Sequence, residues 1–166
     1  MRSLVGPLLL ACWLTWGAGP ALAAEAPAPP LSGSTFDGRP FDLAQRRGRV
    51  VMLVLWRTDC AVCLSKMPEL RANAAGWATK PFDLVTVNLD PRREDALAYE
   101  AALRQTGAAR LPMWTLWHGN LRLPAEWQRP ARLPVLLLID AEGRLVKRHE
   151  GRVPPEAWDE VAELLP

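Results

Sequence analysis

Two cysteines at C-x-x-C spacing, Cys60 and Cys63, are the residues of this sequence that point most directly to chemistry. Such a pair can be half of a zinc site, a haem attachment site or a thiol-disulfide couple. Structural zinc needs four ligands, and the sequence has no second C-x-x-C, while His118 and His149 stand far apart. Haem attachment needs a histidine directly after the second cysteine, where this chain has Leu64. We therefore interpret the pair as a redox couple.

A structural disulfide is the other common use of two cysteines in an exported domain. A bridge between Cys60 and Cys63 would close a very short loop, and it would remove little entropy from the unfolded chain. The spacing therefore favours a chemical role over a structural one.

The N-terminus predicts export from the cytoplasm. Arg2 is followed by an apolar stretch from Leu4 to Trp16 and by a small-residue cleavage site at 21–23, the three parts of a secretory signal peptide. The apolar stretch is too short for a spanning helix. We expect a signal peptide over residues 1–23 and a periplasmic protein. Two alternatives stay open, namely lipidation of Cys12 and membrane anchoring by an uncleaved signal.

The rest of the chain predicts a single domain behind a short tether. Residues 24–30 are rich in Pro and Ala, and residues 31–166 are long enough for a domain with its own core. The chain has 20 Lys and Arg against 18 Asp and Glu. This near balance argues against a nucleic-acid partner. We expect no cofactor.

Patterns on either side of the cysteines predict the elements that position them. Asp37-Gly38, within residues 35–43, is a strong hairpin-turn signal. Residues 49–56 form a continuous apolar, β-branched run, which is typical of a strand buried on both faces. A helical period of apolar residues begins at Cys60.

The remaining chain alternates between strand and helix patterns. We expect strands over 82–89, 111–117, 134–140 and 144–150, a less regular segment up to Arg132, a helix from Asp90-Pro91 to about Gln105, and a last helix that buries Trp158, Val161 and Leu165. These elements indicate an α/β fold with a central mixed β-sheet flanked by helices.

This arrangement places Cys60 where a buried strand passes into a helix. Unpaired backbone N–H groups and the helix dipole favour negative charge there. At C-x-x-C sites of this kind the pKa of a cysteine falls from about 8.5 to roughly 3.5–7.5. We expect Cys60 to attack a substrate disulfide, and Cys63, one turn further along the helix, to resolve the mixed disulfide.

Two stretches resemble thioredoxin-fold proteins. WRTDCAVCLSKMP (56–68) resembles their W-x-x-x-C-x-x-C-x-x-x-x-P motif, and RLPVLLLIDAEGRLV (132–146) resembles their cis-proline strand and hairpin. Together with the predicted export, the N-terminal stretch DGRPFDLAQRRGRVV (37–51) and the extra segment at 111–132 are similar to the TlpA/ResA-like branch. The resemblance covers residues 31–165.

The resemblance implies a thioredoxin fold with an N-terminal β-hairpin extension and an inserted segment before the cis-proline strand. It implies an extracytoplasmic thiol-disulfide oxidoreductase that acts on protein disulfides, often as a reductant in cytochrome c maturation or copper-centre assembly. A membrane thiol reductase is a possible partner that would recharge the dithiol. It also implies that Pro134 is cis and lies against the two sulfurs, and that Trp56 borders the site.

Three positions depart from the pattern of that branch. Its members commonly carry a glutamate three residues after the second cysteine, and thioredoxins often carry a buried aspartate on the central strand, whereas this chain has Lys66 and Val54. We expect resolution without a protein carboxylate, with Lys66 either stabilising the Cys63 thiolate or solvated on the helix. Asp59 either caps the helix or raises the pKa of the adjacent Cys60.

Two other functions stay open at this point. Cys60 and Cys63 could bind Cu(I), which prefers soft ligands, although copper-handling proteins of this fold usually have wider cysteine spacing and a nearby histidine. A binding module with a redox-inert disulfide is the remaining alternative. The redox potential and the copper stoichiometry would separate these functions.

Overall fold

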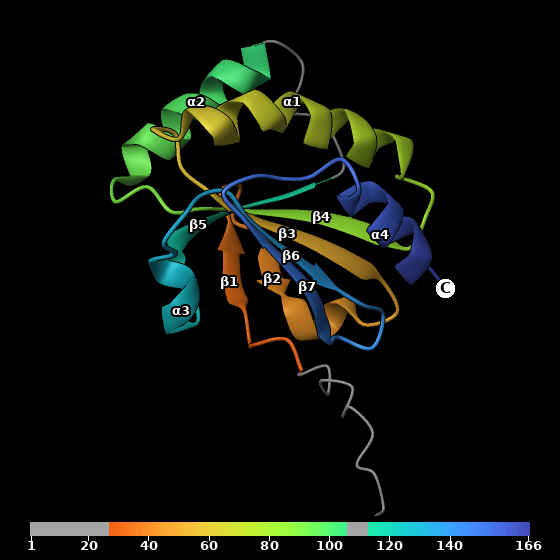
Figure 1. The fold of residues 1–166 in the computed structure, drawn as a ribbon. Helices are drawn as coiled ribbons and strands as arrows, with labels where there is room; N and C mark the ends of the chain where they lie inside the picture. Colours follow the sequence, from red (N-terminus) through yellow and green to blue (C-terminus); the bar gives the residue numbers. More distant parts are fainter. Residues whose placement is uncertain (1–26, 106–112) are drawn as a thin grey trace, which may run out of the picture.

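The computed structural model describes residues 27–105 and 113–166, so the predicted signal peptide lies outside the described residues. The strands are β1 (Ser32–Thr35), β2 (Pro40–Asp42), β3 (Val50–Trp56), β4 (Phe82–Asn88), β5 (Met113–Arg122), β6 (Val135–Ile139) and β7 (Leu145–Glu150). The helices are the 3-10 turn η1 (Leu43–Arg46), α1 (Ala61–Gly76), α2 (Arg93–Gln105), α3 (Ala125–Gln128) and α4 (Ala157–Leu164). Within the described residues the strands form one mixed seven-stranded sheet in the order β2-β1-β5-β4-β3-β6-β7 (Figure 1). The predicted α/β class is confirmed.

Strand β3 lies inside the sheet and is buried on both faces, as its apolar run predicts. It pairs parallel with β4 and antiparallel with β6. Alternate side chains enter two core clusters, with Val54 and Trp56 in one and Leu53 and Leu55 in the other. Each of the residues 50–56 is at most 1% exposed.

Helices cover the two faces of this sheet. Helices α1 and α2 lie over one face (Figure 1), where α1 contributes Met67 and Leu70 to the core and α4 contributes Val161. On the other face, α3 contributes Trp127 and β2 contributes Phe41. Cys63 belongs to the same core cluster as Met67 and Leu70, so the disulfide lies on the face that α1 and α2 cover.

The predicted N-terminal hairpin is formed by β1 and β2. These strands pair antiparallel, with Gly33 opposite Phe41, and Gly38 in the turn has a φ of 82°, a conformation that favours glycine. The preceding chain also contacts the domain, because the N–H of Ala28 donates to the carbonyl of Gly143 at 2.9 Å. Part of the stretch expected to be a tether therefore lies along the β6–β7 turn.

The expected helix start at Asp90-Pro91 is wrong, because α2 begins at Arg93. Asp90 is 2% exposed, and its carboxylate is hydrogen-bonded to Thr58 and Asn88. A side chain used in this way is not available to cap the helix.

The strand expected over 111–117 is longer than predicted. It runs from Met113 to Arg122 as β5, and residues 111 and 112 lie outside the described part of the chain. Its first half pairs parallel with β4, and its second half pairs antiparallel with β1, with Leu121 opposite Gly33. The second half is a strand because the N-terminal hairpin supplies its hydrogen-bond partners.

The predicted C-terminal hairpin consists of β6 and β7, and Asp140 closes its turn. Asp140 is 4% exposed. One carboxylate oxygen accepts the backbone N–H of Arg144 at 2.8 Å, and the other accepts Nε of Arg144 at 2.7 Å. Burial alone would raise the pKa of the Asp140 carboxyl, but the backbone and guanidinium of Arg144 outweigh it, and the pKa lies below its ordinary value of 3.8.

Asp140→Asn is expected to lower the free energy of unfolding by about 1–3 kcal/mol at neutral pH, because charged hydrogen bonds of a buried group are lost. The folded-state pKa of Asp140 lies below the unfolded value of 3.8. Its stabilisation is therefore present above the unfolded pKa and is lost as the pH falls through the folded pKa. Urea unfolding of both proteins across acidic pH measures this difference. Glu142→Gln, at a side chain 66% exposed, is the matched control. A stability difference that does not change with pH would contradict the prediction.

Candidate active site

Cys60 and Cys63 form a disulfide where the chain leaves β3 and enters α1. The two sulfurs are 2.11 Å apart, and the Cα atoms are 5.2 Å apart. Cys60 is the N-cap of α1, and its sulfur accepts the backbone N–H of Cys63 at 3.1 Å. The Cys60 sulfur therefore lies at a helix N-terminus, where backbone N–H groups and the helix dipole stabilise a thiolate.

The two cysteines differ in their exposure. Cys63 is 2% exposed and packs in the core cluster that contains Met67. Cys60 is only partly buried, and Ala61 beside it is exposed. Val62 is 51% exposed and is the only large hydrophobic side chain that is exposed among the described residues. A partner protein can therefore approach the disulfide from the Cys60 side.

Trp56 and Pro134 lie at the strand ends next to the disulfide segment. The Leu133–Pro134 peptide bond is cis, as expected. Pro134 directly precedes Val135, which pairs with Leu55 of β3. Trp56 is 1% exposed and shares a core cluster with Cys63. The structure thus brings both residues to the end of β3, while contact of Pro134 with the sulfurs stays a prediction.

Asp59 does not cap α1, so that expectation is wrong, because Cys60 occupies the N-cap position. The Asp59 carboxylate lies 2.6 Å from a terminal guanidinium nitrogen of Arg57. Nε of Arg57 lies 3.9 Å from the carboxylate of Asp90. The Arg57 guanidinium is therefore shared by two carboxylates, and it offsets the negative charge that Asp59 places beside Cys60.

Asp90 holds the segment between β3 and the disulfide, a role that was not predicted. One carboxylate oxygen accepts the backbone N–H of Thr58 at 3.0 Å, and the other accepts the side-chain amide of Asn88 at 2.9 Å. The Asp90 carbonyl accepts Nε1 of Trp117 at 2.8 Å, and Nε2 of His118 lies 3.0 Å from it. This buried group thus fixes the backbone two residues before Cys60.

The sequence does contain a signal for Asp90. Asn88 and Asp90 follow an apolar run that forms a parallel neighbour of β3, and Trp56 pairs with Asn88. The carboxyl ends of parallel strands meet at the same edge of a sheet, where functional residues gather. Polar residues at that edge are therefore candidates for the site, not only for a helix cap.

Lys66 and Val54 occupy the two positions where related proteins often carry a carboxylate. Nζ of Lys66 is 2.8 Å from the carboxylate of Glu69, one turn further along α1. Val54 is a buried member of the core under α1. A direct effect of Lys66 on Cys63 stays a prediction.

Within residues 27–105 and 113–166, no group of three or more His, Cys, Asp and Glu side chains is arranged to hold a metal ion. In the same part of the chain, no helix is both long enough and apolar enough to cross a bilayer.

Comparison with known proteins places this geometry among redox proteins. The family model described as Redoxin matches residues 23–165. A thiol-disulfide oxidoreductase ResA from Halalkalibacterium halodurans is 26% identical over 129 residues, which cover 78% of this chain and 69% of that protein.

Solved structures share the fold. A thiol:disulfide interchange protein of the thioredoxin family from Chlorobium tepidum TLS matches with a TM-score of 0.65 at 22% identity, covering 85% of this chain and 96% of that one. A thiol:disulfide interchange protein from Bacteroides sp. matches with a TM-score of 0.64 at 21% identity, covering 87% and 91%. The expected thioredoxin fold is confirmed.

Asp90→Asn is expected to lower the free energy of unfolding of the oxidised protein by about 1–3 kcal/mol. An amide offers a single acceptor oxygen, so one buried N–H of Thr58 or Asn88 would face an NH₂ group. The Thr58 amide should also exchange faster with deuterium, as urea unfolding and NMR would measure. Asp59→Asn is the control, because that side chain is 65% exposed and its surface pair contributes less than about 1 kcal/mol. Equal stability of wild type and Asp90→Asn would contradict this role.

Proposed function

Because the chain belongs to the Redoxin family and is a TlpA/ResA-like thiol-disulfide oxidoreductase of the thioredoxin superfamily, we propose that Cys60 is its attacking cysteine and Cys63 its resolving cysteine. The observation that carries this assignment is the difference between the two sulfurs. Cys60 is the partly exposed N-cap of α1, whereas Cys63 is 2% exposed in the core.

The proposed reaction starts from the reduced protein. The Cys60 thiolate attacks one sulfur of a substrate disulfide, so that a mixed disulfide forms and the other substrate sulfur leaves as a thiolate that takes up a proton. Cys63 then loses its proton to water and attacks the Cys60 sulfur, which releases the second substrate thiolate. The substrate gains two electrons and two protons, and the protein ends with the Cys60–Cys63 disulfide.

The proposed substrates are disulfides of partner proteins outside the cytoplasm. The expected signal peptide over residues 1–23 supports this location, and the exposed Ala61 and Val62 beside Cys60 offer an uncharged surface to a partner. We place the protein on the reducing side, in cytochrome c maturation or copper-centre assembly, with a membrane thiol reductase that recharges the dithiol.

The neighbouring residues have proposed supporting roles. Pro134 covers the side of the disulfide that faces β6, and Trp56 shields the inner sulfur from water, in keeping with its burial beside Cys63. The pairing of Asp59 with Arg57 at 2.6 Å keeps the charge next to Cys60 small.

At neutral pH, iodoacetamide is expected to label Cys60 of the reduced protein at least about tenfold faster than Cys63, because only Cys60 combines access with the helix N-terminus. Peptide mass spectrometry gives the rate for each cysteine separately. In an insulin reduction assay, Cys60→Ser should be inactive, and Cys63→Ser should accumulate mixed disulfides.

Equal labelling of the two cysteines would contradict the assignment. Expression of the Cys63→Ser variant and identification of the proteins bound to Cys60 test the substrate class directly. Capture of only cytoplasmic proteins, or of none, would contradict the proposed location and direction of the reaction.

Lys66→Glu is expected to raise the pKa of Cys63, because a nearby ammonium that favours the thiolate is replaced by a carboxylate that disfavours it. Lys66→Gln should give a smaller shift in the same direction. Carbon NMR of the Cys63 Cβ, titrated in the reduced protein, measures both. Lys80→Gln, beyond the end of α1, is the control. If the titrations of all four proteins superimpose, Lys66 does not affect the pKa of Cys63, and its ion pair with Glu69 is its only role.

A further inference from the structure

Arg57 begins the turn that carries the chain from β3 to the disulfide. Its carbonyl accepts the backbone N–H of Cys60 at 3.3 Å, so the turn closes on the first cysteine. Asp59 lies inside this turn and directly precedes Cys60. The side chains of Arg57 and Asp59 therefore belong to the same short loop as the sulfur that we assign as the attacking one.

The guanidinium of Arg57 lies between two carboxylates that differ in how firmly they are held. On one side, Nε lies 3.9 Å from a carboxylate oxygen of Asp90, a side chain that is 3% exposed and that accepts the N–H of Thr58 at 3.0 Å. On the other side, a terminal nitrogen donates to Asp59 at 2.6 Å, a side chain that is 65% exposed. The fixed, buried acid thus anchors the guanidinium, and the guanidinium holds the exposed acid.

A released Asp59 would disfavour the Cys60 thiolate in two ways. Its negative charge would raise the pKa of the neighbouring thiol. Its carboxylate is also a preferred acceptor for the N–H groups at a helix start, and it would compete for the N–H of Cys63, which donates to the Cys60 sulfur at 3.1 Å. The pair with Arg57 neutralises the charge and engages the carboxylate.

The other charged or titratable groups near this corner come from α1, α2, β5 and the segment before β6: Lys66, Tyr99, His118 and Arg132. The lysine is paired with Glu69 at 2.8 Å, and Nε2 of the histidine lies 3.0 Å from the carbonyl of Asp90. Burial raises the pKa of the tyrosine above its ordinary value of 10.0, so this group is uncharged near neutral pH. The arginine before β6 is exposed. Along the chain, the Arg57–Asp59 pair is therefore closest to the attacking sulfur.

We propose that Arg57 is a positioning residue of the redox couple, which holds the Asp59 carboxylate and thereby keeps Cys60 a stable thiolate and the dithiol a milder reductant. The reduced protein contains this thiolate and the disulfide form does not, so a group that stabilises the thiolate favours the reduced form. The inference rests on the proposed function, because it concerns the same attacking sulfur.

A double-mutant cycle of Arg57→Gln and Asp59→Asn tests this role. The pH dependence of iodoacetamide labelling gives the pKa of Cys60, and equilibration with glutathione gives the tendency of the dithiol to be oxidised. Arg57→Gln should raise the pKa by at least about half a unit. At about pH 8, above the usual range of such cysteines, oxidation of the dithiol should become at least about threefold more favourable, which corresponds to that shift.

The second arm of the cycle separates positioning from a direct effect of the guanidinium. Asp59→Asn should move both readouts in the opposite direction, because the charge of Arg57 is then unpaired. In this background, Arg57→Gln should have no more than about half its effect in the wild type, because no carboxylate is left to release. Arg57→Lys keeps the charge and should shift both readouts less than Arg57→Gln does.

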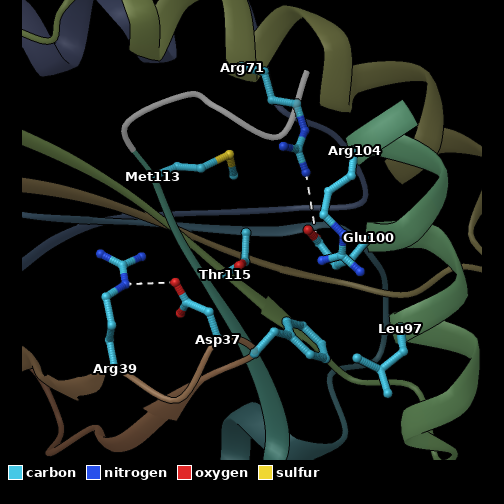
Figure 2. Close-up of a pocket in the computed structure, with 9 residues that line it drawn as sticks. Asp37, Arg39, Arg71, Leu97, Glu100, Arg104, Met113 and Thr115 are labelled. Atoms are coloured by element: carbon cyan, nitrogen blue, oxygen red, sulfur yellow. Dashed lines mark hydrogen bonds and ion pairs between the residues drawn. The ribbon is translucent and has the colours of Figure 1, made fainter. Parts of the chain in front are cut away.

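Arg39→Gln is the matched control. Arg39 also pairs with an aspartate two residues away, Asp37, at 2.9 Å, and the two side chains are 53% and 62% exposed (Figure 2). This pair belongs to the β1–β2 turn, and β5 and β4 separate β1 from β3, a spacing of roughly 14 Å between the two strands. Charges that far apart are screened at physiological ionic strength, where the Debye length is about 8 Å. Arg39→Gln should leave both readouts unchanged.

Three results would overturn the inference. The first is a pKa and a glutathione equilibrium that Arg57→Gln does not change. The second is an equal effect of Arg57→Gln with and without Asp59, which would mean that the guanidinium acts on Cys60 directly. The third is an unchanged pKa in Asp59→Asn, an exposed position that tests the inference even if Arg57→Gln is unstable. The proposed function fails differently, because a wild-type couple that does not exchange with glutathione at all would contradict it.

Discussion

The parallel pairing of β3 with β4 is the constraint on which the active site depends. It places Trp56 opposite Asn88, so that both strands end at the same edge of the sheet. Two residues beyond β4, the buried carboxylate of Asp90 accepts the backbone N–H of Thr58 from the segment that leaves β3. The chain then enters α1 with Cys60 as its N-cap. The position of the Cys60 sulfur is thus set by the register of β3 on β4 and by one buried acid that follows β4.

Helical geometry accounts for the difference between the two sulfurs. Once α1 begins directly after Cys60, residues three and four positions apart share one face of the helix. Cys63, Met67, Leu70 and Ala74 follow this spacing and are all at most 2% exposed. The two residues between the cysteines point away from this face and are exposed. The same spacing that permits the disulfide therefore gives its two ends different access to solvent.

The sequence predicts the parts of this structure that local patterns determine. The apolar run of β3, the turn at Gly38 and the C-x-x-C segment each contain their own signal, and all three are found as expected. The second half of β5 is a strand because β1, far away in the sequence, pairs with it. Asp90 does not cap the helix as expected, because its carboxylate accepts the backbone N–H of Thr58, 32 residues earlier. Partners this remote in sequence leave no periodic signal near the residues they affect. The C-x-x-C spacing by itself located the redox pair.

The two outer strands of the sheet have a consequence for how this protein meets others. An unpaired strand edge can add a strand from another chain, and short length, proline and charge at the edge oppose this. Strand β2 is three residues long and begins with Pro40, which has no N–H to donate. At the opposite edge, β7 presents the exposed, charged Lys147, Arg148 and Glu150. Partner proteins of a thiol-disulfide oxidoreductase can expose unfolded, strand-forming segments, and both edges of this sheet disfavour pairing with such segments.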